Sequence, residues 1–183
     1  AFNSVMYERK NKVVSVDPVY QFSKKEIEKR IEETFETVMN QTKERENRFV
    51  WKKIKNLEEL GKIRMLAMKD FLNDYEKGKK EGRYIAGELP ILPFQENEFD
   101  LSLSSHFLFL YYHLLSLDFH ILSIDEMLRV SKEIRIFPLL DLEGKKSSYL
   151  NQVEEHYREK GFYVEQVRVE YEFQKDGNRM LKI

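Results

Sequence analysis

The chain contains no cysteine, a single tryptophan and only seven glycines among its 183 residues. The lack of cysteine excludes disulfide bonds, thiolate zinc sites and a cysteine nucleophile, and it suits a reducing cytoplasm. Basic and acidic residues nearly balance, 31 against 32, so no overall basic field favours nucleic acid. The longest apolar run, Phe107–Leu117, is too short to cross a bilayer. We therefore expect a soluble cytoplasmic protein that binds neither nucleic acid nor membrane.

The sequence does contain enough apolar material for a folded domain, because 42% of its residues are hydrophobic and 13% are aromatic. Short β-branched or aromatic runs alternate with segments in which apolar residues recur every three or four positions. This alternation predicts an α/β fold with a mainly parallel sheet and helices on both faces. The last segment alternates, turns at KDGN and returns, which predicts a C-terminal antiparallel hairpin. We expect residues 1–183 to form a single domain.

Helix starts are predicted by capping boxes, in which a short polar side chain and an acidic residue three positions later cap each other's backbone amides. The three boxes are Ser23 with Glu26, Asn56 with Glu59, and Ser123 with Glu126. At the amino end, Phe2, Val5 and Met6 have the spacing of a helix face. We expect Ala1–Arg9 to be the end of a helix whose start precedes this sequence.

Polar residues follow three of the predicted strands. Asp17-Pro18 follows VVSV, Gly87-Glu88 follows YIA, and Ser104-Ser105-His106 ends the run FDLSLSSH. In a parallel sheet, ligands bind outside the carboxyl ends of the strands, so these residues are candidates for a binding site. The alternatives are that Asp17-Pro18 is only a turn and that Glu88 is a surface carboxylate.

Several motifs resemble those of the class I S-adenosylmethionine-dependent methyltransferases. Gly87–Phe94 and Asn97–Leu101 are similar to the family pattern G-D-x-x-x-L-P-F…x-F-D-L-V. Glu126–Val130 resembles E-x-x-R-V-L-K-P-G-G, although Lys132-Glu133 stands where the family often has Pro-Gly-Gly. The resemblance covers roughly Val13–Ile183, and the C-terminal hairpin is similar to the reversed last strand pair of that fold. It implies a Rossmann-like methyltransferase sheet and S-adenosylmethionine as cofactor.

The resemblance also implies roles for the residues at the strand ends. Asp17, followed by Pro18, would hold the ribose hydroxyls of the cofactor, since a carboxylate can accept two hydrogen bonds from a diol. Gly87-Glu88 would meet the adenine amino group, and Leu89 would pack on the base. Ser104 and Ser105 would line the floor where cofactor and acceptor meet.

The acceptor side of the site is less specific. His106 could act as the general base towards a hydroxyl or amine acceptor, or it could be a histidine hydrogen-bonded at a strand end. Tyr111 and Tyr112 could line the acceptor pocket, or the aromatic run could be helix core against the sheet. The heptad spacing of His106, His113 and His120 does not favour a metal site, because ligands seven residues apart on one helix are about 10 Å apart.

Residues 40–82 are expected to form a helical insert that serves as a lid or a dimer surface, with Phe49–Tyr75 shaping the choice of acceptor. Between Lys43 and Lys69 there are nine basic and four acidic residues, with Phe49 and Trp51 interleaved. A weak RNA-contacting face is the alternative. We favour a solvated helical insert, because the whole chain is not basic.

The glycine loop G-x-G-x-G of the family, and the first strand before it, have no counterpart in this sequence. That strand is the middle of the family's sheet, and without it neighbouring strands would expose unpaired backbone. We therefore expect the natural protein to continue before Ala1 and to have a mass well above 22.1 kDa.

The resulting functional prediction is methyl transfer from S-adenosylmethionine to a small-molecule acceptor, by a protein that could be a homodimer. The alternative is a catalytically inactive methyltransferase-like scaffold that associates with other proteins through the insert. A nucleotide-dependent oxidoreductase is a third reading, disfavoured by the terminal hairpin and the missing dinucleotide fingerprint.

Overall fold

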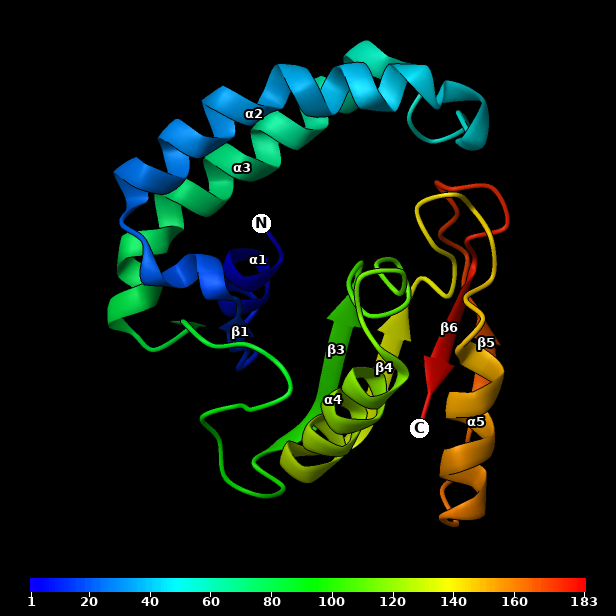
Figure 1. Cartoon of the computed structure of the whole chain (residues 1–183). Helices are drawn as coiled ribbons and strands as arrows, with labels where there is room; N and C mark the ends of the chain where they lie inside the picture. Colours follow the sequence, from blue (N-terminus) through cyan, green and yellow to red (C-terminus); the bar gives the residue numbers. More distant parts are fainter. The chain divides into compact units, whose positions relative to one another are not determined.

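The computed structural model describes all 183 residues, which form two compact units (Figure 1). Unit 1 comprises Ala1–Asn47 and Trp51–Glu88, and unit 2 comprises Arg48–Val50 and Leu89–Ile183. Five α-helices and six strands alternate along the chain, which confirms the predicted mixed α/β class. None of the helices combines the length and the apolar character needed to cross a membrane.

Unit 1 contains a two-stranded parallel sheet made of β1 (Ser15–Val16) and β2 (Tyr84–Ile85). Ser15 pairs with Tyr84 and Val16 with Ile85. The pairing extends past the strand, because the amide of Asp17 donates to the Ile85 carbonyl at 3.3 Å. The carboxyl ends of both strands therefore lie at the same edge of this sheet.

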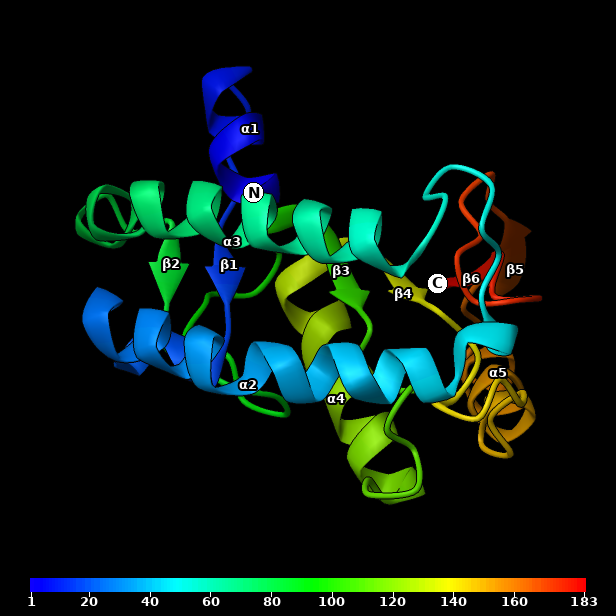
Figure 2. The same ribbon diagram turned by 90° about the horizontal axis from the view of Figure 1, so that it is seen from above.

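The helical elements of unit 1 are α1 (Phe2–Glu8), the 3-10 turn η1 (Pro18–Gln21), α2 (Lys24–Glu44) and α3 (Leu57–Lys80), with η2 (Glu46–Arg48) between α2 and α3. Of these helices, α2 and α3 begin where the sequence predicts. Ser23 and Glu26 cap α2 reciprocally, and the Asn56 side chain accepts from the Glu59 amide at 2.9 Å. Figure 2 shows α2 and α3 running side by side.

The apolar face expected at the amino end of the chain is not buried, although the predicted helix is present. Phe2 is 60% exposed and Val5 is 40% exposed, whereas Asn3 is the buried residue of α1. Hydrogen bonds, not apolar contacts, hold α1 against the rest of unit 1. The side-chain amide of Asn3 donates to the Arg83 carbonyl and to the Ser15 hydroxyl, both at 3.0 Å. The helix expected within Ala1–Arg9 is therefore present, but the face set by the spacing of Phe2 and Val5 is not the one that packs.

Unit 2 contains a four-stranded sheet in the order β3-β4-β6-β5. Its strands are β3 (Phe99–Ser105), β4 (Ser131–Phe137), β5 (Glu165–Arg168) and β6 (Arg179–Lys182). The first pair is parallel, and β6 runs antiparallel to both β4 and β5. The C-terminal hairpin is thereby confirmed. The expectation of a mainly parallel arrangement is not met in this sheet, where two of the three pairings are antiparallel.

Two helices, α4 (Leu117–Val130) and α5 (Leu150–Glu159), pack with the sheet of unit 2 around one apolar core. Its fully buried members include Leu108, Phe109, Ile124, Ile134, Ile136, Leu150, Val153, Tyr157 and Leu181. Both helices share the core with Ile134 and Ile136 of β4, so within unit 2 they cover the same face of the sheet. The alternate positions Glu133, Arg135 and Lys182 form ion pairs instead. Helices on both faces were expected, and unit 2 has them on one.

The third predicted helix start is wrong. Ser123 is buried inside α4 and its hydroxyl has no hydrogen-bond partner. The helix begins seven residues earlier because Ser116 caps it, accepting from the Phe119 amide at 3.1 Å. Glu126 is therefore not part of a capping box, and its carboxylate accepts a hydrogen bond from the Leu92 amide instead.

Candidate functional site

The structure brings Asp17 and Gly87-Glu88 to the same edge of the sheet in unit 1. They follow the carboxyl ends of β1 and β2, which are parallel neighbours, and both acidic residues are exposed. Asp17 Oδ1 accepts from the Val19 amide at 2.8 Å and so caps η1, which begins with Pro18. The cap uses one carboxylate oxygen, and Oδ2 has no hydrogen-bond partner within the chain. This edge of unit 1 therefore presents two carboxylates with acceptor positions open to solvent.

An aromatic residue lies beside this carboxylate edge. Tyr20 belongs to η1, and its ring centroid is 5.2 Å from that of Tyr84. Burial, together with the negative charge of Asp17, raises the pKa of Tyr20 to about 12. The phenol consequently stays neutral beside the Asp17 carboxylate at physiological pH.

In unit 2, Ser104, Ser105 and His106 lie at the carboxyl end of β3. Ser104 is buried, whereas Ser105 and His106 are exposed. The His106 amide donates to the Phe137 carbonyl at 2.6 Å, and His106 has a left-handed backbone with φ of +57°. Ser105 Oγ lies 2.8 Å from His106 Nδ1. Partial burial of the ring lowers the pKa of His106, which favours a neutral imidazole.

The remaining predicted site residues also belong to unit 2. Leu89 packs against the apolar core. Tyr111 and Tyr112 lie in a series of turns between β3 and α4, where Tyr111 is exposed and Tyr112 is half-buried. The aromatic run is thus not the helix considered from the sequence, although Phe109 within it is fully buried. The predicted site residues therefore form two groups, one at the sheet edge of each unit.

The Glu126–Arg129 motif seen in the sequence holds a loop. Glu126 Oε1 accepts from the Leu92 amide at 2.7 Å, and Arg129 donates to the Phe94 carbonyl at 2.9 Å and the Leu92 carbonyl at 3.3 Å. The hydrogen bonds from Arg129 lower the pKa of Glu126 below its ordinary value, and the Leu92 amide adds to the effect. The motif fixes residues 89–94, the loop that begins with Leu89.

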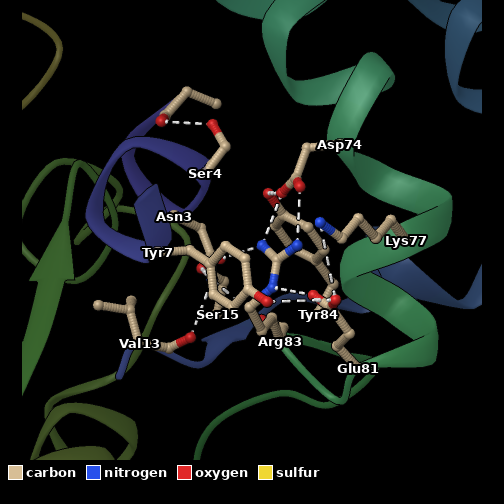
Figure 3. A network of polar contacts seen from close by, with 11 residues as sticks. Asn3, Ser4, Tyr7, Val13, Ser15, Asp74, Lys77, Glu81, Arg83 and Tyr84 are labelled. Atoms are coloured by element: carbon tan, nitrogen blue, oxygen red, sulfur yellow. Dashed lines mark hydrogen bonds and ion pairs between the residues drawn. The ribbon is translucent and has the colours of Figure 1, made fainter. Parts of the chain in front are cut away.

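The densest polar network of unit 1 lies at the amino ends of β1 and β2, away from the carboxylate edge (Figure 3). At its centre, Arg83 is 6% exposed and forms two hydrogen bonds with Asp74, at 2.6 and 2.7 Å. Arg83 also donates to Asn3 and Glu81, both at 2.8 Å, and its guanidinium stacks 4.3 Å from the centre of the Tyr7 ring. Because these donors are satisfied within the protein, we assign the network to stability rather than to ligand binding.

One pair of side chains that could take part in proton transfer is not indicated by the sequence. His113 Nε2 lies 3.1 Å from Asp141 Oδ2 in unit 2. The two residues are 28 positions apart, and the sequence singles out His113 only through its heptad spacing with His106 and His120. No local pattern indicates that these residues meet, since the contact depends on the turns that follow β3 and β4.

The three histidines of the heptad spacing do not converge. His106 ends β3 and His113 pairs with Asp141. His120 is fully buried in α4, with its ring nitrogens 2.7 Å from the Ser116 carbonyl and 3.0 Å from the Leu108 carbonyl. No group of three or more potential ligand side chains suited to a metal ion is found in the structure.

Comparison with known proteins identifies one informative relative. The "Uncharacterized protein MJ0045" of Methanocaldococcus jannaschii is 37% identical over 172 residues, which cover 93% of this chain and 75% of the relative. No family model matches the sequence, and no solved structure matches it.

Proposed function

We propose that this chain, which belongs to the same family as the Methanocaldococcus jannaschii protein MJ0045, transfers a methyl group from S-adenosylmethionine to a small-molecule acceptor. The observation that carries the proposal is the pair of exposed acidic residues, Asp17 and Glu88, after the carboxyl ends of two parallel neighbouring strands. A carboxylate there can accept hydrogen bonds from both hydroxyls of a ribose, and a second can accept from an adenine amino group. Their negative charge also favours a cationic sulfonium ligand.

The strand order of unit 2 supports a Rossmann-like methyltransferase fold over a dehydrogenase fold. β6 lies between β4 and β5 and is antiparallel to both. This is the reversed last strand pair that the sequence resemblance implies. We propose that the parallel pair β3-β4, with Ser104 and Ser105 at its carboxyl edge, belongs to the same type of sheet.

In this proposal the sulfonium supplies the reactivity when the cofactor is bound. The residues of the chain bind the nucleoside, hold the acceptor in line and exclude water, and none of them needs to become covalently attached. Asp17 and Glu88 of unit 1 would bind the nucleoside part.

Isothermal titration calorimetry of the natural protein with S-adenosylmethionine and S-adenosylhomocysteine tests the proposal. We expect saturable binding of both compounds with a dissociation constant in the micromolar range. No heat of binding at millimolar ligand would defeat the proposal, because physiological cofactor sites are much tighter than that.

A second function, association with other proteins as an inactive scaffold, is favoured by a specific observation on the insert. Ile63 and Leu66 of α3 are 43% and 60% exposed. Analytical ultracentrifugation distinguishes this candidate: a mass of twice the chain, abolished by Leu66→Glu, together with no binding of S-adenosylmethionine, would favour the scaffold.

A further inference from the structure

His113 and Asp141 form a hydrogen-bonded pair with unequal exposure. The His113 side chain is 55% exposed, whereas the Asp141 side chain is 1% exposed. A buried carboxylate that contacts an exposed imidazole can orient the ring and stabilise the positive charge that it acquires on accepting a proton. The pair therefore differs from His106, whose Nδ1 contacts the Ser105 hydroxyl.

The Asp141 carboxylate is held rigidly by its own loop. Oδ1 accepts from the amides of Glu143 and Lys145, both at 2.8 Å. The Asp141 main chain is fixed as well, since its amide donates to the Lys145 carbonyl and its carbonyl accepts from Gln174, again at 2.8 Å. With Oδ1 occupied by two amides, Oδ2 is the oxygen that faces His113.

The same geometry determines which nitrogen of His113 is basic. A carboxylate oxygen only accepts, so the imidazole carries its proton on Nε2 and donates it to Asp141 Oδ2. Nδ1 then has a free lone pair, and it has no hydrogen-bond partner in the chain. The Tyr112 ring lies against the imidazole with centroids 3.9 Å apart, which restrains the ring plane.

The pair also lies where an acceptor site is expected in this type of sheet. His113 follows β3 and Asp141 follows β4, and these parallel strands are in register up to Ser105 and Phe137 at their carboxyl ends. Figure 1 shows the connections after both strands on the same side of the unit 2 sheet. Ligands of α/β sheets bind at this edge.

We propose that His113 is the general base for the acceptor and that Asp141 is its positioning residue. This assignment rests on the proposed methyl transfer for its reaction, and it names the substrate class as acceptors with a hydroxyl or an amine. Nδ1 of His113 takes the proton of the acceptor, whose oxygen or nitrogen forms a bond to the methyl carbon. The bond between that carbon and sulfur breaks, and its electron pair remains on the sulfur of S-adenosylhomocysteine. Asp141 stabilises the resulting imidazolium.

An Asp141→Asn substitution tests the pair sharply. The two loop amides require an oxygen at Oδ1, so the new NH2 group points at His113 Nε2 and donates to it. The imidazole must then carry its proton on Nδ1, and the lone pair that the reaction needs is lost.

The first experiment is labelling of the natural protein with diethyl pyrocarbonate, followed by mass spectrometry of the histidine peptides. We expect His113 to react faster than His106 in the unaltered protein, and Asp141→Asn to slow His113 by about tenfold while leaving His106 unchanged. Equal labelling of His113 with and without the carboxylate would overturn the proposal. Nitrogen NMR of the unaltered protein provides a second measurement that needs no variant: a proton on Nε2 of His113 supports the pair, and a proton on Nδ1 contradicts it.

The second experiment measures methyl transfer to a panel of phenols and amines, including 4-methylumbelliferone, catechol and phenethylamine. For any panel member that is methylated, His113→Gln should reduce kcat by about 100-fold, with the affinity for S-adenosylhomocysteine unchanged. An unchanged kcat would contradict the role of His113. If the protein binds no S-adenosylmethionine, the proposed methyl transfer is wrong. Labelling of His113 that depends on Asp141 would still show that the carboxylate of Asp141 sets the basicity of His113.

Discussion

At the scale of single residues, the buried charge of Arg83 shows how this chain handles ionised groups in its interior. Asp74 neutralises it with two short hydrogen bonds, and the same bonds lower the pKa of Asp74 and raise that of Arg83. The Tyr84 hydroxyl also donates to Asp74, at 2.9 Å. A network of this kind is stable only while every member keeps its partners.

We predict that Asp74→Ala destabilises the protein by about 3 kcal/mol, because it leaves a buried guanidinium without its main counter-charge. Urea unfolding followed by circular dichroism measures the effect. Since the folded pKa of Asp74 is lower than its ordinary value, its contribution is present above that ordinary value and is lost as the pH falls through the folded pKa. Glu58→Ala is the control, because Glu58 forms only an exposed pair with Lys62 and should change little. Equal stability of both variants would contradict the assignment.

Two glycines of α3 offer a matched pair of substitutions. A Cβ at Gly78 would clash with the Tyr84 ring, 2.7 Å from Cδ2, and would lie 2.9 Å from Arg83 Cζ. A Cβ at Gly61 would meet Met39 and Phe35 at an ordinary 3.4 Å. We predict that Gly78→Ala lowers the free energy of unfolding by about 1–3 kcal/mol, whereas Gly61→Ala leaves it unchanged or raises it by up to about 1 kcal/mol. Thermal unfolding of both variants measures the two changes in stability. A Gly78→Ala variant more stable than the unaltered protein would be inconsistent with this packing.

At the scale of elements, sequence patterns were reliable where the deciding interaction is local. Ser23 and Asn56 cap helices because their partners lie three residues away, and the C-terminal hairpin follows from alternation around a turn. The prediction that Ser123 caps a helix is wrong because another serine, Ser116, caps the same helix seven residues earlier. The local pattern cannot show which of the two serines is the cap. The apolar spacing at the amino end does not identify the buried face of α1, because Asn3 contacts Arg83, 80 positions away, and periodicity cannot reveal such a contact.

The loop at residues 89–94 depends on one carboxylate of α4. We predict that Glu126→Gln reduces the protection of the Leu92 amide from hydrogen exchange and destabilises the protein by about 1–2 kcal/mol, because a charged acceptor is lost. In the unaltered protein this protection should be present above pH 4.5 and disappear as the pH falls through the lowered pKa of Glu126. Hydrogen exchange by NMR at several pH values measures it. Unchanged protection in the variant would show that the loop does not need the carboxylate.

At the scale of the whole molecule, the sequence predicted the mixed α/β class and the polar residues that follow β1, β2 and β3, but not how distant segments pair. The contact between His113 and Asp141 is an example, because it exists only once β3 and β4 have aligned their following turns. The placement of Arg48–Val50 is another example of a contact between distant segments. This segment belongs to unit 2, and its Val50 amide donates to the Phe173 carbonyl at 2.7 Å. Such pairings depend on tertiary structure and leave no local pattern.

The proposed function assigns cofactor contacts to the carboxylate edge of unit 1, which makes a prediction for binding. Asp17→Ala should weaken the binding of S-adenosylhomocysteine by about tenfold or more, because it removes charged hydrogen bonds. The matched control is Glu36→Ala on α2, which changes an exposed acidic residue of the same unit. Calorimetry that finds the control as weak as Asp17→Ala would contradict the assignment.

The most direct measurement of the central claim is a crystal structure of the natural protein with S-adenosylhomocysteine bound. We predict that the Asp17 carboxylate accepts hydrogen bonds of about 2.7 Å from the ribose hydroxyls and that Glu88 accepts from the adenine amino group. A nucleoside bound elsewhere, with Asp17 and Glu88 both facing solvent, would contradict the proposed methyl transfer.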